Sequence, residues 1–362
     1  MPSNRRRPPP VPSDPSSADR RSGRTSHSNR LPAAPADRME ALRSLIDGAL
    51  RDAVHDRGPD VLYDPIRYVL DGNGKRLRPI LLLLVADALG TDVDRALPAA
   101  LAVEVFHNFT LVHDDIMDDS DERRGRPTVH TASDRGWDTA TAILTGDMMM
   151  GLSYELLSDL DDRTDHRAVF AAYHPMVEHL CSGQARDEAL EDRPDASVDD
   201  YLQMIDGKTV ALFATVFELG AILGDASADE RSVLRRAGRD LGRGFQIQDD
   251  WLDIVGNQTE TGKPVGGDLL NGKKTFVTLT ALDAAGADRE AWLRSILDRP
   301  DVSASEVDAV RRWMEEAGVF ETTRDAFTSY FDAAREGLAV LPPHPATDAL
   351  QHVIDYTQHR AR

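Results

Sequence analysis

Apolar residues recur every three or four positions along most of residues 39–362, and the stretch from Ile80 to Ala86 is apolar throughout. This spacing matches the turn of an α-helix, about 3.6 residues, whereas the strict alternation expected of half-buried strands has little support. Ala, Leu, Arg, Asp and Glu dominate and aromatic residues make up only 6%, which also favours helices. The pattern predicts an all-α fold, in which a last helix follows the proline-containing turn at 341–345.

Residues 1–38 differ from the rest of the chain. They are rich in Pro, Ser and Arg and show no apolar periodicity, so they cannot bury enough apolar surface to offset the entropy lost on ordering. We therefore expect a disordered leader over 1–38, without the apolar segment of a secretory signal. No linker rich in Pro or Gly divides residues 39–362, which we expect to form one helical bundle.

The charge and cysteine content narrow the possible partners. The net charge of the 362 residues is −20; the leader contributes +5, from eight arginines and three aspartates, so the remainder carries −25. Such an acidic body is a poor match for nucleic acid, and no apolar run is long enough to cross a membrane. The one cysteine, Cys181, excludes an intrachain disulfide and fits a reducing, cytoplasmic location. We expect its side chain to be at least half-buried on a helix.

Two aspartate clusters of identical spacing carry the strongest chemical signal. The first is Asp114, Asp115 and Asp118, and the second is Asp249, Asp250 and Asp253. On a helix, the first and last carboxylates of each cluster leave the same face about 6 Å apart along the axis. Like charges so close require a cation, and such oxygen ligands suit Mg²⁺, which completes its coordination with water and phosphate. The clusters therefore predict a Mg²⁺-bridged diphosphate between two facing helices.

Basic segments accompany both clusters. Residues 72–79 combine a Gly-rich turn with three cations before an apolar helix, which suits an anion, although a solvated basic turn is the competing interpretation. Arg123 and Arg124 follow the first cluster, and guanidinium groups suit phosphate oxygens. Lys208 and Thr209 precede a buried helix, where they could face a reacting centre or only cap the helix. The lysines of 256–275 belong either to a phosphate-binding loop or to a generic surface loop.

In this order, the motifs resemble those of the trans-polyprenyl diphosphate synthases, the family of farnesyl and geranylgeranyl diphosphate synthases. The five motifs are GxGKRxRP (72–79), DDxxD with RRG (114–125), KT (208–209), FQxxDDxxD (245–253) and GKxxGxDLxxGKKT (262–275). The resemblance covers residues 39–362 and implies a helical bundle around a deep substrate cavity, paired as a homodimer. One departure is Asn73, where the family most often has glycine; since Asn tolerates positive φ, we expect the turn to survive.

The resemblance also implies roles for individual residues. Asp114, Asp118 and Asp249 would bind Mg²⁺, about three ions per active site, with Asp115, Asp250 and Asp253 as further ligands or supporting groups. The residues matching those that hold isopentenyl diphosphate are Lys75, Arg78, His107 and Arg124. The residues matching those that hold the allylic substrate, a dimethylallyl, geranyl or farnesyl diphosphate, are Arg123, Lys208, Lys263 and Lys273. The implied catalytic residues are Lys208, Thr209 and Gln246, of which the last two stabilise the carbocation, while the released diphosphate removes the proton.

Residues before the first cluster bear on product length. Thr110 lies four positions before Asp114 on the same helix face, with Phe109 beside it. One aromatic with one small neighbour, and a cluster without an insertion, resemble bacterial geranylgeranyl (C20) synthases. Phe109 could instead be a core residue, with Met148 to Met150 forming the cavity floor. The chain could also be a farnesyl or longer-chain synthase, a class I terpene cyclase or a non-catalytic prenyl-diphosphate-binding partner; the intact second cluster argues against the last two.

Overall fold

The computed structural model describes residues 31–191, 193–255, 267–270, 272–297, 299 and 302–360. Almost all of them lie in helices, as the apolar spacing predicts, and the only strands within these ranges form one short hairpin. The all-α prediction is confirmed. None of the described helices is both long and apolar enough to span a bilayer.

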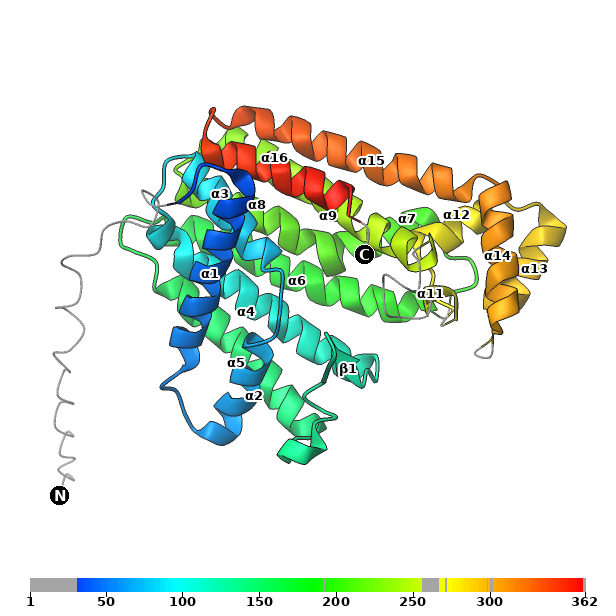
Figure 1. Ribbon diagram of the computed structural model, residues 1–362, viewed down its shortest axis with the longest axis horizontal. Coiled ribbons are helices and arrows are strands. Elements are labelled where there is room, and N and C mark those ends of the chain that lie inside the picture. Colours follow the sequence, from blue (N-terminus) through cyan, green and yellow to red (C-terminus); the bar gives the residue numbers. More distant parts are fainter. Residues whose placement is uncertain are drawn as a thin grey trace, which may run out of the picture.

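The elements follow one another with short connections (Figure 1). The α-helices are α1 (Pro35–Val54), α2 (Asp60–Leu70), α3 (Leu77–Ala88), α4 (Val93–Met117), α5 (Thr139–Ser158), α6 (His166–Glu191), α7 (Val198–Ile205), α8 (Ala211–Leu223), α9 (Ala228–Val255), α11 (Gly267–Leu270), α12 (Phe276–Ala284), α13 (Ala287–Leu297), α14 (Ala304–Glu316), α15 (Val319–Gly337) and α16 (Pro345–Gln358). The remaining elements are strands β1 (Glu122–Arg123) and β2 (Arg126–Pro127), 3-10 helices η3 (Ser133–Arg135) and η5 (Leu338–Val340), and π-helix η4 (Asp206–Val210).

Helix α8 lies at the centre of the bundle. It packs against α3, α4, α6 and α9, and eleven of its thirteen residues are buried. Helix α4 is nearly as enclosed, between α3 and α5, and α9 is covered on its other side by α15. A smaller apolar core, built around Leu293, Val310 and Met314, joins the C-terminal end of α9 to helices α11 to α14. The long helices are therefore fixed by burial on several sides, which suits them to carry a rigid site.

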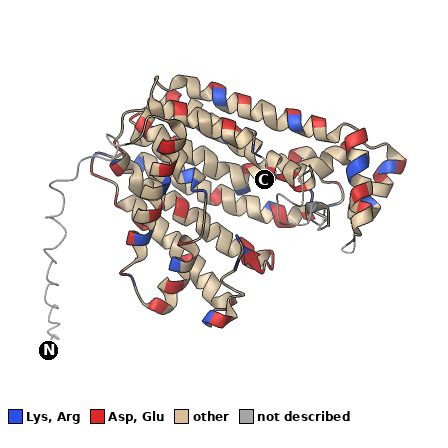
Figure 2. Ribbon diagram, viewed as in Figure 1, with Lys and Arg blue, Asp and Glu red and all other residues tan. Residues whose placement is uncertain are grey.

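The C-terminal ends of α4, α6 and α9 lie toward the same end of the bundle (Figure 1). Helix α4 ends at Met117 with Asp118 as its C-cap, and α9 ends at Val255, two residues after the second cluster. Both aspartate clusters therefore lie at helix C-termini, as predicted for the first. Figure 2 shows acidic residues over much of the bundle and a group of them beside the hairpin that follows α4.

Three details differ from the sequence-based expectations. Helix α1 begins at Pro35, four residues before the expected domain boundary, while residues 1–30 of the leader lie outside the described ranges. Cys181 is on a helix but exposed rather than half-buried, because it lies on the outward face of α6. The left-handed residue of the basic turn is Arg76, with φ of 50°, and not Asn73.

Helix α6 and the π-helix η4 pass each other at two glycines. A Cβ atom on Gly183 would overlap the backbone of Gly207 and Lys208. A Cβ atom on Gly207 would lie 2.5 Å from the carbonyl oxygen of His179 and 2.7 Å from Gly183 Cα. Since real Cβ atoms do not approach so closely, only glycine permits this contact. The contact fixes the backbone that carries Lys208 and Thr209.

We predict that Gly183→Ala lowers the free energy of unfolding by about 1–3 kcal/mol, because the two backbones must separate. Gly151→Ala on α5 is the matched control: its Cβ would meet no atom within 4 Å, and alanine favours a helix by about 0.5–1 kcal/mol over glycine. Urea denaturation of both variants measures the difference. Equal stability of Gly183→Ala and the unsubstituted protein would contradict the close contact.

Candidate active site

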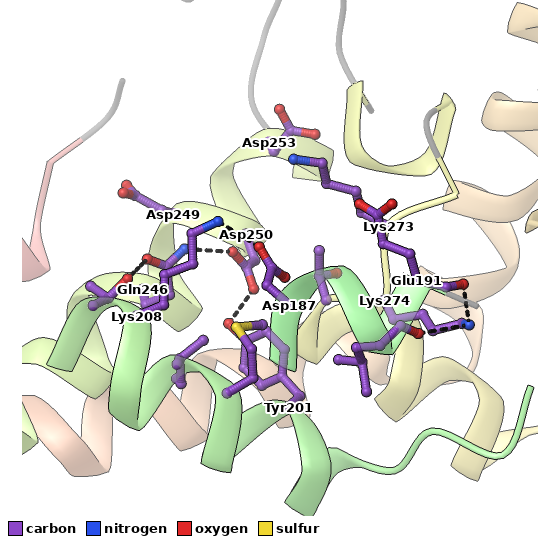
Figure 3. Close-up of a pocket in the computed structure, with 15 residues that line it drawn as sticks. Asp187, Glu191, Tyr201, Lys208, Gln246, Asp249, Asp250, Asp253, Lys273 and Lys274 are labelled. Carbon is purple, nitrogen blue, oxygen red and sulfur yellow. Dashed lines mark hydrogen bonds and ion pairs between the residues drawn. The ribbon is translucent and has the colours of Figure 1, made fainter. Parts of the chain in front are cut away.

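A cavity of about 310 Å³ opens beside the second aspartate cluster (Figure 3). Its wall combines α6, α7, η4, the end of α9 and the segment before α12. The charged residues lining it are Asp187, Glu191, Lys208, Asp249, Asp250, Asp253, Lys273 and Lys274. Carboxylates and ammonium groups thus share one pocket, an arrangement that can receive both a metal ion and its anionic ligand.

The aspartates of the second cluster leave α9 in different directions. Asp250 is only 6% exposed; its Oδ2 accepts a short hydrogen bond from the Tyr201 hydroxyl, and its Oδ1 accepts one of 3.1 Å from Gln246 Nε2. Asp249 points away from Asp250 (Figure 3) and accepts a hydrogen bond of 2.6 Å from Arg360 Nη2. In the same view Lys273 points toward Asp253. Asp250 is therefore buried and held by two side chains of the protein, whereas Asp249 and Asp253 are only half-buried in the cavity wall.

The first cluster likewise combines one buried, hydrogen-bonded aspartate with two that are more accessible. Asp115 is 5% exposed and accepts a hydrogen bond of 2.7 Å from Arg123 Nε, yet burial still raises the pKa of Asp115. Burial also raises the pKa of Asp114, helped by repulsion from Asp118 and Asp187, although Lys208 opposes the shift. Asp118 is exposed at the end of α4. A carboxylate with a raised pKa gains most from a nearby cation, because the cation stabilises its charged form.

Lys208 links the two clusters. Its Nζ donates to Asp187 Oδ2 at 2.5 Å, and it lines the same cavity as the second cluster. Burial alone would lower the pKa of Lys208, but Asp187, Asp114 and Asp118 together raise it. Lys208 therefore stays charged, interacts electrostatically with the first cluster and lines the cavity of the second.

The predicted cation-stabilising pair is adjacent. Thr209 Oγ1 donates to Gln246 Oε1 at 2.9 Å, and both residues line the cavity. Since Gln246 Nε2 donates to Asp250, its amide orientation is set from both sides. The pair presents fixed oxygen dipoles next to the aspartates.

The basic turn (residues 72–79) also meets the hairpin of β1 and β2, which carries Arg123 and Arg124. A Cβ atom on Gly74 would lie 3.1 Å from Arg124 Nη1, so Arg124 lies closely against the turn at this glycine. Arg78 Nη1 lies 3.1 Å from His107 Nε2, and the Arg78 guanidinium stacks over the Phe213 ring with 4.6 Å to its centroid. Three of the four residues predicted to hold isopentenyl diphosphate thus gather at one place; the fourth, Lys75, is exposed on the same turn.

The cations in this group are short of compensating charge. Burial lowers the pKa of Arg78 to about 10, although Glu104 and Asp249 oppose the shift. Burial and the surrounding arginines lower the pKa of His107 well below its usual 6.5, so the imidazole is neutral at neutral pH and Arg78 donates to its Nε2. Arg78 Nε is buried without a hydrogen-bond partner among the described residues. Such an unused donor favours an anionic ligand.

Some of the predicted site residues are not brought into this arrangement. Lys263 lies outside the described residues, as do the other positions of 256–266. Phe109 and Thr110 do not line the cavity of Figure 3; Phe109 packs edge-on against Phe106 and His113, and Thr110 Oγ1 donates to the carbonyl oxygen of His107. Their link to product length stays a prediction.

The sequence analysis missed several residues of the site. They are Asp187, which pairs with Lys208; Tyr201, which donates to Asp250; Arg360, which pairs with Asp249; and Glu104, which pairs with Arg76. Each of these partners is at least 21 positions away along the chain, so no local spacing marks the pair. Only the isolated acidic residue Glu104 in an otherwise apolar stretch of α4 gave a signal.

The donor set fits Mg²⁺. Among the described residues no three Asp, Glu, His or Cys side chains lie close enough to hold an ion by themselves. Mg²⁺ does not need such a cage, because it binds one or two carboxylates and takes water and phosphate oxygens as its other ligands. The exposed Asp118 and the half-buried Asp114, Asp249 and Asp253 supply hard oxygen donors of this kind.

Comparisons with known proteins agree with this geometry. A family model described as polyprenyl synthetase matches residues 59–314. A geranylgeranyl diphosphate synthase of Methanosarcina mazei is 35% identical over 321 residues, covering 88% of this chain and 96% of that protein. A (2E,6E)-farnesyl diphosphate synthase of Mycobacterium bovis is 38% identical over 298 residues, covering 80% and 81%. The crystal structure of geranylgeranyl pyrophosphate synthetase from Pyrococcus horikoshii superposes with a TM-score of 0.83 at 32% identity, covering 90% of this chain and 98% of that one.

We predict that His107 stays neutral at pH 6.5, because its burial beside Arg78 lowers its pKa. Nuclear magnetic resonance titration of protein with labelled histidine measures this directly. The His107 signal is identified by its loss in His107→Gln, and it should keep the chemical shift of a neutral ring at pH 6.5. A titration midpoint at or above the ordinary value would show that the ring is not desolvated as the structure has it.

Proposed function

The chain belongs to the polyprenyl synthetase family and is a trans-prenyltransferase, and from this premise we propose that it makes mainly geranylgeranyl diphosphate (C20). In this reaction isopentenyl diphosphate condenses with an allylic diphosphate. The observation that supports the assignment is that Lys208 lines the cavity of the second acidic cluster and is acted on by Asp114 and Asp118 of the first, beside a separate basic site at Arg78 and Arg124. Two distinct places for diphosphate are what a condensation of two diphosphates requires.

We assign the more accessible carboxylates to the metal. Asp114, Asp118 and Asp249 are the proposed direct ligands of about three Mg²⁺ ions, with Asp253 as a further ligand. Asp115 and Asp250 are the proposed supporting groups, since each is buried and already accepts hydrogen bonds from protein donors. When bound, Mg²⁺ neutralises charge that develops on the leaving diphosphate.

The protein groups have electrostatic and positional roles. Arg123, Lys208 and Lys273, together with Lys263, would hold the allylic diphosphate and favour heterolysis of its allylic C–O bond. The oxygen atoms of Thr209 and Gln246 would lie beside the carbocation and stabilise it. Lys75, Arg78, His107 and Arg124 would hold isopentenyl diphosphate so that its double bond attacks the cation. The released diphosphate would accept the proton that is then lost.

The C20 product rests on the residues before the first cluster. Phe109, 8% exposed, is one bulky aromatic followed by the small Thr110, a combination that should admit a longer chain than two aromatics would. Overall similarity does not decide the length, because relatives of similar identity are named as geranylgeranyl and as farnesyl diphosphate synthases. Dimethylallyl, geranyl and farnesyl diphosphates are the candidate primers.

We also propose that two chains pair as a homodimer. Ile143 and Leu144 of α5 are 44% and 58% exposed, and pairing through this helix would cover these two apolar side chains. Sedimentation velocity that finds only the 39.8 kDa chain would contradict pairing.

The direct test is a product assay. Purified protein with Mg²⁺, labelled isopentenyl diphosphate and each of the three allylic primers should release diphosphate and form geranylgeranyl diphosphate, identified by chromatography after dephosphorylation. Omitting Mg²⁺ should abolish turnover, because the leaving group is then not neutralised. Absence of turnover with all three primers would contradict the activity, whereas a main product of another length would contradict only the C20 assignment.

We predict that Phe109→Ala shifts the main product to chains at least one isoprene unit longer, because removing the ring would make room for a longer chain along α4, below Asp114. Phe320→Ala, which removes a half-buried ring in the core of α11 to α14, is the control for the loss of an aromatic residue and should leave the product unchanged. The same chromatography measures both. An unchanged product distribution in Phe109→Ala would remove Phe109 as the residue that limits chain length.

A further inference from the structure

A buried carboxylate on α4 lies among the cations of the proposed isopentenyl diphosphate site. Glu104 is 2% exposed and lies three residues before His107 on the same helix. Its Oε1 accepts hydrogen bonds from Arg76 Nη1 at 2.7 Å and from Asn108 Nδ2 at 3.0 Å. A buried carboxylate is unfavourable unless it is paired. The hydrogen bonds from Arg76 and Asn108 supply this pairing for Glu104.

Arg76 ties Glu104 to the basic turn. The Arg76 side chain is buried, its Nε donates to Asp47 Oδ1 at 2.8 Å, and its Nη2 donates to the carbonyl oxygens of Leu70 and Gly72. Its backbone has a positive φ of 50°. One guanidinium therefore connects the turn to α1, α2 and α4. Every guanidinium nitrogen of Arg76 already donates within the protein, whereas Arg78 Nε has no partner among the described residues.

Glu104 also acts electrostatically on the neighbouring Arg78 and Arg124. Gly74 would place a Cβ atom 3.0 Å from Arg76 Nη1 and 3.1 Å from Arg124 Nη1, so these two guanidinium groups flank the same glycine. Glu104 favours the charged form of Arg76, Arg78 and Arg124, while Arg124 disfavours that of Arg78. Three arginines of like charge thus share Glu104 as a buried counter-charge.

From this arrangement we propose that Glu104 is a positioning residue, which holds Arg76 and the basic turn in place so that Arg78 and Arg124 are gathered before diphosphate arrives. The proposal deepens the proposed function and rests on it, because it concerns the same substrate site. Glu104 is covered by Arg76 and Asn108, so it compensates the arginines without competing for their outward donors. The site can then bind a diphosphate without first bringing mutually repelling groups together.

The test is steady-state kinetics of Glu104→Gln in the full chain with Mg²⁺. Glutamine keeps the shape and the hydrogen-bond acceptor but removes the charge. We expect the KM for isopentenyl diphosphate to rise about tenfold or more, with the KM for the allylic primer and kcat within about threefold of the unsubstituted protein. The selective rise follows because only the isopentenyl site is built on the basic turn.

Asp47→Asn is the matched control. Asp47 also pairs with Arg76 but is more exposed, at 28% of its side chain, and it is not among the groups that act on Arg78 or Arg124. It should change the KM for isopentenyl diphosphate by less than about threefold. If Glu104→Gln does not fold, Glu104→Asp replaces it, because Asp keeps the charge on a side chain that is too short to reach Arg76 in the same way. For Glu104→Asp we expect a rise in the KM for isopentenyl diphosphate that is smaller than tenfold but larger than that of Asp47→Asn.

Two results would overturn the proposal. An unchanged KM for isopentenyl diphosphate would show that Glu104 has only a structural role. A lowered KM would show that its negative charge simply opposes the substrate, because removing it makes the site more positive. Lys75→Ala tests the site assignment separately. If the unsubstituted protein turns over normally and Lys75→Ala leaves the KM for isopentenyl diphosphate unchanged, the substrate does not bind at the basic turn. In that case Glu104 cannot have the proposed positioning role.

Discussion

Repulsion between like charges at one end of a helical bundle is the constraint on which the site depends. Both aspartate clusters lie at helix C-termini, where the macrodipole already disfavours anions. The structure compensates them with cations from elsewhere in the chain: Arg123 on Asp115, Lys208 near the first cluster and Arg360 on Asp249. These cations neutralise only part of the acidic charge, and what remains favours a divalent ion with a diphosphate bound to it.

The basic side of the site shows the same constraint with the opposite sign. Arg76, Arg78 and Arg124 are gathered by glycines of the turn and by Glu104 on α4, and His107 is neutral because a further charge would be unfavourable there. Both the acidic and the basic half of the site thus keep an excess of charge that a bound ligand can neutralise. A diphosphate substrate with its metal ions supplies opposite charge to both halves, which accounts for binding and for activation of the leaving group together.

The sequence predicted the helical fold and most members of the site, because helical periodicity and short motifs are local signals. It did not predict which aspartates turn inward: Asp250 is held by Tyr201 and Asp115 by Arg123, and such contacts depend on how α7, α9 and the hairpin pack. It also did not predict the π-helix at Asp206–Val210, which contacts α6 through Gly183 and Gly207, 24 positions apart along the chain. Product length is the least accessible property, since it depends on the space that remains for a growing chain after many side chains have packed together.

The most direct test of the account is a crystal structure of the protein with Mn²⁺ in place of Mg²⁺ and an unreactive analogue of the allylic diphosphate. Anomalous scattering would locate the metal ions. We expect ions bound by Asp114 and Asp118 of α4 and by Asp249 of α9, all contacting the same diphosphate, with metal–oxygen distances of about 2.0–2.3 Å. Ions on only one of the two helices, or a diphosphate that contacts neither cluster, would contradict the central claim.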